Sequence, residues 1–140
     1  MRAVFDTSVL VAAVRSAKGA SRELLRMVLD GELRPLVSVP LVLEYEAVLT
    51  RPEHLAGSLD AQANVDIVRA FCRMGEPVHI SHRLRPQLVD PDDEFVLEAA
   101  YHGKAEMIVT LNTRDFLIAA RRFGIAALRP GEALERIRRQ

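Results

Sequence analysis

Short apolar runs alternate with longer stretches of helical periodicity along this chain, and this alternation constrains the fold more than any other feature. The runs predict strands at Ala3–Phe5, Leu36–Val39, Val78–Ser81, within Ala105–Thr110 and at Ile125–Leu128. Apolar residues three and four positions apart predict helices after Asp6 and at Ser21–Leu29, Leu41–Leu49, Gln62–Met74, Asp90–His102, Arg114–Phe123 and Pro130–Arg138. Strands that alternate with helices are typical of an α/β sandwich around a mostly parallel sheet.

The length and composition suit one soluble domain spanning residues 1–140. The chain has 140 residues, of which 49% are hydrophobic, which is enough for one ordinary core. Cys72 is the only cysteine and lies among apolar residues, so we expect a small residue inside a helix and a reducing cytoplasm. The first residues lack the pattern of a signal peptide, and no apolar run approaches the ~20 residues that span a bilayer. We therefore expect a cytoplasmic protein.

The formal charge is balanced, with 19 basic and 19 acidic residues. Bulk electrostatic attraction therefore does not mark the chain as a protein that coats nucleic acid. Any contact with RNA must come from a local patch, and arginine supplies most of the positive charge from which such a patch could be built.

Several acidic residues have ordinary structural explanations when each is taken alone. Asp6 directly follows a predicted strand and is a suitable N-cap for the next helix. Asp92 and Asp93 stand at the start of a predicted helix, where carboxylates interact favourably with the helix dipole. None of the three identifies a functional site by itself.

Glu44 is harder to explain as a surface residue. It lies between Leu41 and Val48 at helical spacing, so its side of the helix is otherwise apolar, and burial of an unpaired carboxylate is costly. Glu46 also has apolar neighbours, so periodicity alone does not choose between the two glutamates.

Taken together, the acidic residues indicate a cation site. Functional groups of parallel sheets gather beyond the carboxyl ends of the strands, and both Asp6 and Asn112 follow predicted strands. Carboxylates that converge from separate elements repel one another unless a divalent cation lies between them, and hard oxygen ligands favour Mg²⁺ or Mn²⁺ over zinc. The four histidines show no ligand spacing, so we expect surface or core residues at His54, His79, His82 and His102.

Four segments carry motifs that occur in a recognisable order. They are VFDTSVL at residues 4–10, PLVLEY at 40–45 with LTRP at 49–52, DPDDEFVLEAA at 90–100, and IVTLNTRDF at 108–116. Together they resemble the successive motifs of the PIN-domain family, closest to the toxins of bacterial VapBC toxin–antitoxin systems. The resemblance covers nearly the whole chain and implies a three-layer α/β/α sandwich with a central, mostly parallel, five-stranded sheet.

The resemblance also implies which acidic residues form the active site. Asp6, Glu44 and Asp93 match the family's first three acidic positions, as catalytic residues and metal ligands. The adjacent Asp92 is a further candidate ligand.

The fourth acidic position departs from the family pattern, because Asn112 stands there and Asp115 follows three residues later. Both are candidate ligands, and either one or two metal ions fit the expectation. Ser8 and Thr110 are expected to support the site through hydrogen bonds.

The activity implied by the resemblance is that of an endoribonuclease that cleaves single-stranded RNA with water activated by Mg²⁺ or Mn²⁺. The carboxylates would act chiefly as ligands, and no covalent nucleophile is needed. With 5% aromatic residues and no tryptophan, base stacking must depend on arginine. Candidate contacts with RNA are Arg15, Arg22, Arg26 and Arg114, with Lys18, Arg121 and Arg122 as further basic residues.

The same resemblance implies partners: an antitoxin protein that covers the acidic pocket, and a second copy in a homodimer. Two other functions are considered. Asn112 suggests a PIN-like RNA- or protein-binding module with weakened catalysis, because an acid is missing there. A metal-dependent phosphatase of the haloacid-dehalogenase type would need a second aspartate where Ser8 stands.

Overall fold

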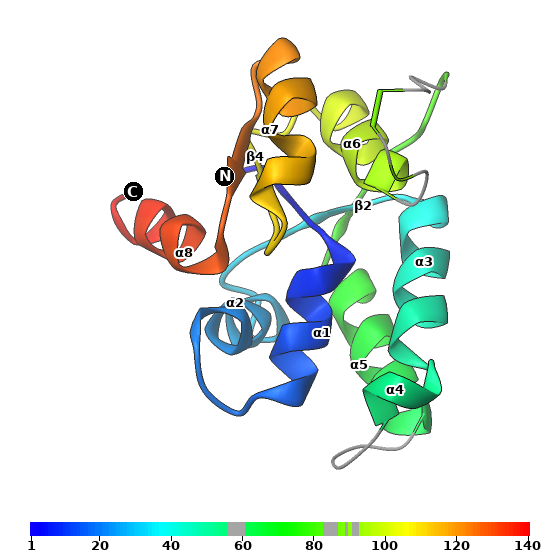
Figure 1. The fold of residues 1–140 in the computed structure, drawn as a ribbon. Coiled ribbons are helices and arrows are strands. Elements are labelled where there is room, and N and C mark those ends of the chain that lie inside the picture. Colours follow the sequence, from blue (N-terminus) through cyan, green and yellow to red (C-terminus); the bar gives the residue numbers. More distant parts are fainter. Residues whose placement is uncertain (56–60, 83–86, 89, 91–92) are drawn as a thin grey trace.

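The computed structural model describes residues 1–55, 61–82, 87–88, 90 and 93–140. Figure 1 shows the order of the elements along the chain. They are β1 (Ala3–Phe5), α1 (Thr7–Arg15), α2 (Ala20–Leu29), β2 (Leu36–Val37), α3 (Val39–Leu49), α4 (Pro52–Leu55), α5 (Ala61–Arg73), β3 (Glu76–Pro77), α6 (Asp93–His102), β4 (Met107–Val109), α7 (Thr113–Arg122), β5 (Ala126–Leu128) and α8 (Pro130–Arg138).

Three parallel strands form the centre of the molecule, in the order β1, β4, β5. Their last residues are in register, because Phe5 pairs with Val109 and Val109 pairs with Leu128. The ladder continues past the strands, since the Asp6 amide donates to the Val109 carbonyl and the Thr110 amide to the Leu128 carbonyl. The residues that follow β1 and β4 therefore meet at one edge of the sheet.

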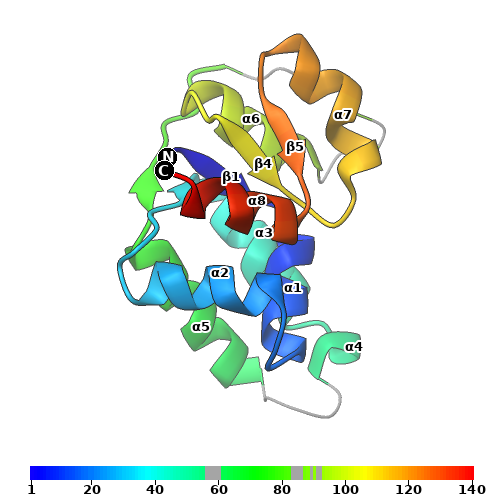
Figure 2. The same cartoon turned by 90° about the vertical axis from the view of Figure 1, so that its left-hand side faces the viewer.

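Helices cover both faces of these strands, which gives the α/β/α layering expected from the sequence. In Figure 2, α8 lies in front of the strands and α6 behind them. The contacts agree, because α8 packs on β4 and β5 while α6 packs on β1, β2 and β4. All of β1 and β4 is buried between these layers, so both strands read as continuous apolar runs. None of the described helices combines the length and the apolar character needed to cross a membrane.

The prediction of a five-stranded sheet is wrong, because the described strands form a three-stranded sheet and a separate pair, β2 with β3. Strand β2 contacts β1 but shares no ladder with it. It is only two residues long and follows Pro35, which has no amide hydrogen to donate. The expected strand Leu36–Val39 therefore ends early, and Ser38 instead caps α3 by accepting a hydrogen bond from the Leu41 amide.

The strand expected at Val78–Ser81 is also wrong, because β3 covers Glu76–Pro77. The amides of Glu76 and Val78 donate to the carbonyls of Pro35 and Val37, and both bonds are 2.7 Å long. Proline can occupy the position between them because no ladder hydrogen bond is required of it there. The sequence pattern did not predict a strand at Glu76–Pro77, because glutamate and proline are rare in strands.

The expected helices agree with the structure to within a few residues. The terminal helix, Pro130–Arg138, has the expected bounds. The helix expected from Asp90 begins at Asp93 in the described residues, and Pro91 and Asp92 lie outside them. The short helix α4 was not expected, although its first residue, Pro52, closes the preceding helix as predicted.

Tyr45 joins α3 to the end of β1. Its phenol is fully buried and donates a hydrogen bond to the Phe5 carbonyl, one residue before Asp6. Its ring also packs edge-on against Phe71 of α5. This contact holds the middle of α3 beside the carboxyl edge of the sheet.

We predict that Tyr45→Phe lowers the free energy of unfolding by about 1–3 kcal/mol, because the Phe5 carbonyl loses a buried donor. Thermal unfolding followed by circular dichroism measures the loss. Tyr101, the other tyrosine, is 39% exposed, so Tyr101→Phe is the matched control and should change stability little. Equal melting temperatures for the two variants would contradict the anchoring role of Tyr45.

Candidate active site

Asp6 lies at the carboxyl end of β1 and is only 5% exposed. It occupies the N-cap position of α1, yet its side chain makes no capping hydrogen bond. Its Oδ2 atom instead accepts hydrogen bonds from the hydroxyls of Ser8 and Thr110, both 2.7 Å long. The capping explanation of Asp6 therefore does not account for its side chain, which is directed to a polar cluster.

The two hydroxyls on Asp6 also fix the loop that follows β4. Ser8 Oγ accepts a hydrogen bond from the Leu111 amide, and Thr110 Oγ1 accepts one from the Asn112 amide. Because each hydroxyl accepts from an amide, its own hydrogen is left to donate to Asp6. Asp6, Ser8 and Thr110 thus form one network that orients the carboxylate and the loop together.

Burial raises the pKa of Asp6, and the negative charge of Asp115 adds to this effect, while the hydroxyls of Thr110 and Ser8 and the Thr7 amide oppose it. Asp6 is therefore an ionisable group held where its charged form is poorly solvated. A nearby cation would offset both the loss of solvation and the repulsion by Asp115.

Asp93 and Asp115 line a common pocket, and the charge of Asp115 acts on Asp6. Asp93 begins α6 and Asp115 lies in the first turn of α7. The basic residues Arg114 and Arg122 line the same pocket, and Arg122 donates to the Gln87 side chain over 2.7 Å. The pocket therefore combines carboxylates with guanidinium groups that can bind phosphate.

Glu44 lies one residue before Tyr45 on α3, so the Tyr45 anchor brings its turn of helix to the same edge of the sheet. Glu46 points elsewhere, because its carboxylate lies 3.9 Å from the guanidinium of Arg69 on α5. Residues two positions apart point roughly 200° apart around a helix. Glu44 therefore faces away from α5. The structure thus distinguishes Glu44 from Glu46, which the sequence periodicity did not. The sequence did not predict the anchoring role of the neighbouring Tyr45, although this residue lies in the same apolar stretch.

Asn112 and Asp115 face different pockets. Asn112 lines a pocket beside α1 together with Ser8 and Arg15, whereas Asp115 lines the pocket that contains Asp93. The charge of Asp115 also acts on Asp6. Of the two candidates for the fourth acidic position, Asp115 is thus the one electrostatically linked to Asp6.

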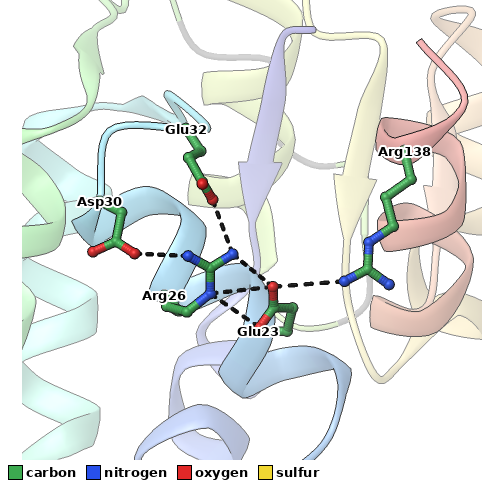
Figure 3. A network of polar contacts seen from close by, with 5 residues as sticks. All are labelled: Glu23, Arg26, Asp30, Glu32 and Arg138. Carbon is green, nitrogen blue, oxygen red and sulfur yellow. Dashed lines mark hydrogen bonds and ion pairs between the residues drawn. The ribbon is translucent and has the colours of Figure 1, made fainter.

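The four arginines expected to contact RNA differ in their surroundings. Arg22 donates to the Ala13 carbonyl over 3.0 Å. Arg26 forms ion pairs with three carboxylates, and Figure 3 shows how one of them, Glu23, also meets Arg138 of α8. These contacts raise the pKa of Arg26 and use its charge within the protein. Arg15 and Arg114 instead line the two pockets next to Asp6.

A complete metal-ligand set is not present in the described residues. Across residues 1–55, 61–82, 87–88, 90 and 93–140, no group of three or more His, Cys, Asp or Glu is placed to hold a metal ion. The candidate ligand Asp92 lies outside these residues. The charge of Asp115 acts on Asp6, and repulsion between two carboxylates is of the kind that a hard divalent cation relieves.

His82 and His102 lie side by side, a contact that the sequence spacing did not predict. Their ring centroids lie 4.8 Å apart, and His102 Nε2 is 2.8 Å from the His82 carbonyl. They lie 20 positions apart in the sequence, so no short motif could have predicted the contact.

Comparisons with known proteins agree with this architecture. No curated protein matches the chain. A chain in the crystal structure of VapBC2 from Rickettsia felis, bound to a DNA fragment from their promoter, is similar in fold, with a TM-score of 0.60 and 14% identity. The match covers 92% of this chain and 98% of that chain. A family model for the PIN domain matches residues 2–114, which include β1, β4 and all the acidic residues considered above except Asp115. The chain therefore belongs to the PIN-domain family.

Proposed function

We propose that this protein is an endoribonuclease that cleaves single-stranded RNA with the help of Mg²⁺ or Mn²⁺. The observation that carries the proposal is the buried Asp6 carboxylate, held by Ser8 and Thr110 at the edge of the sheet with the charge of Asp115 beside it. A residue that only capped α1 would not need a second hydroxyl on its Oδ2 atom. Here that second hydroxyl comes from Thr110, which is buried and follows the distant strand β4. Membership of the PIN-domain family supports a nuclease.

In this proposal the ligands are drawn from Asp6, Glu44, Asp93 and Asp115, whose carboxylates must come closer together than in the structure described above to share one ion. Asp92, which lies outside the described residues, is a further ligand candidate, and Asn112 is not one. A divalent cation supplies positive charge that stabilises the transition state of phosphodiester hydrolysis and makes water more acidic. Ser8 and Thr110 hold the Asp6 oxygen in position. Arg114, on the rim of the acidic pocket, binds a phosphate of the RNA.

The proposed biological role is that of a toxin controlled by an antitoxin protein. The similar solved structure is of a VapBC complex, which supports a protein partner for this chain as well. Large apolar side chains are exposed on two helices near the acidic pocket: Val39 and Leu43 on α3, and Leu117 and Ile118 on α7. Such a surface suits contacts with the antitoxin and with a second copy in a homodimer. We place this activity in the cytoplasm.

Asp6→Asn and Asp115→Asn should each lower kcat/KM for a labelled single-stranded RNA by about 100-fold or more. Loss of a ligand should cost at least as much as loss of a residue that only supports one. Fluorescence-based cleavage assays with Mn²⁺ measure the change. Asp66→Asn is the matched control, because Asp66 is exposed on α5.

The same assay can overturn the assignment of residues. Full activity in Asp115→Asn together with a large loss in Asn112→Ala would return the fourth position to Asn112. RNA binding without cleavage, at every Mn²⁺ concentration tested, would favour a binding module without catalysis.

Asp6→Asn should also change the pH dependence of stability in the presence of EDTA. Burial raises the folded-state pKa of Asp6 above its ordinary value of 3.8, so its contribution to stability is full below 3.8 and is lost as pH rises. Asparagine carries no such penalty and can still accept both hydroxyl hydrogen bonds. The melting temperature of Asp6→Asn relative to wild type should therefore rise from pH 3 to pH 7. A constant difference across this range would contradict the burial of a charged Asp6.

Mn²⁺ should raise the melting temperature of the wild-type protein, because an ion that binds only the folded state stabilises it by mass action. At a concentration about 100 times Kd the gain is about 2.7 kcal/mol. Differential scanning calorimetry should show the shift in the wild type and in Asp66→Asn, and a much smaller one in Asp6→Asn. An equal shift in all three proteins would place the ion elsewhere.

A further inference from the structure

A second pocket is lined in part by Ser8, whose hydroxyl also donates to the Asp6 carboxylate. It is formed by α1, by the end of α3 and by the loop after β4, and its volume of about 430 Å³ lies within the range of ligand-binding pockets. The described residues that line it are Thr7, Ser8, Val11, Ala12, Arg15, Val48, Leu111 and Asn112.

The walls of this pocket are apolar and come from three separate elements. Val11 and Ala12 project from α1, Val48 from α3, and Leu111 from the loop. Val11, Ala12 and Leu111 keep part of their surface exposed to solvent, so an apolar ligand would remove that surface from water.

The pocket is directly connected to the acidic site. Ser8 lines the pocket, and its Oγ atom donates to Asp6 over 2.7 Å and accepts from the Leu111 amide. The Asn112 amide is likewise bonded to Thr110, the other hydroxyl on Asp6. A group bound in the pocket therefore lies one side chain away from the carboxylate proposed to act at the phosphate.

The polar groups on the rim match the edges and faces of a nucleobase. Among the described lining residues Arg15 alone is charged, and it is exposed. Its guanidinium can stack on a base or pair with a neighbouring phosphate. The Asn112 side chain offers both donors and an acceptor for a base edge, which a carboxylate at this position would not.

Resting on the proposed ribonuclease function, we infer that this pocket binds the base of a nucleotide adjacent to the cleaved phosphodiester bond. Apolar walls suit a base better than a phosphate, and the single positive charge at the rim complements an RNA strand. Asn112, which departs from the expected acidic residue, is then a specificity-determining residue of the substrate pocket.

Binding is tested without catalysis, on ¹⁵N-labelled protein in EDTA. Millimolar adenosine, cytidine, guanosine and uridine 5′-monophosphates are compared with ribose 5-phosphate, which has no base. We expect at least one nucleotide to shift the amide resonances of Ala12, Leu111 and Asn112, and ribose 5-phosphate to leave them unchanged. Ala12→Phe, which fills the pocket, should abolish these shifts. Ala17→Phe is the matched control, because Ala17 is exposed in the loop after α1.

Cleavage provides a second test, with short RNAs that carry one abasic ribonucleotide at successive positions around the cleaved bond. One position should lower kcat/KM of the wild type by about tenfold, as expected for loss of one stacked base. Arg15→Ala, which keeps the pocket shape, should lose activity on the normal RNA and lose less when that base is absent. The two changes should therefore be non-additive.

Several results would overturn the inference. These are no amide shifts with any nucleotide, equal shifts with ribose 5-phosphate, or unchanged shifts and cleavage in Ala12→Phe. The last result would place the nucleotide outside this pocket. Failure of the ribonuclease proposal would look different, because no RNA would be cleaved while the binding experiment in EDTA still reported on the pocket.

Discussion

The proposed site depends on one constraint, which is that a carboxylate must be held at the end of a strand that is wholly buried. Residues Ala3 to Phe5 are inaccessible to solvent, and Asp6 follows them with almost no exposure. The cost of this burial is opposed locally by two hydroxyl donors and globally by any cation that binds. Burial raises the pKa of Asp6, so a positive charge bound nearby would stabilise its ionised form.

The hydroxyls of Ser8 and Thr110 also determine which pocket each residue of the following loop lines. They accept hydrogen bonds from the amides of Leu111 and Asn112 and so hold the loop after β4. In this conformation Asn112 lines the pocket beside α1, while Asp115, a turn later, lines the pocket that contains Asp93. The replacement of an acid by an amide thus need not weaken the acidic site. In the proposed ribonuclease, the amide removes a negative charge from the pocket inferred to bind an RNA base.

The helices could be predicted from the sequence because their signals are local, and the strands less well because theirs are not. Pro130 and the charged last turn define α8 without reference to the rest of the chain. The extent of β3, by contrast, is set by which carbonyls of β2 are available, and a residue pattern does not contain that information. The acidic residues were recognised as a set from their motifs. The distinction between Glu44 and Glu46 depended on the position of Arg69, and that between Asn112 and Asp115 on hydrogen bonds to Ser8 and Thr110.

Pro77 has a consequence for how this molecule can meet others. It lies in β3, the strand that borders β2 and no other described strand, so its face away from β2 is an outer margin of the structure. An incoming polypeptide that added itself there as a further strand would find a pyrrolidine ring in place of an amide hydrogen. Assembly through that margin by backbone pairing is thereby discouraged.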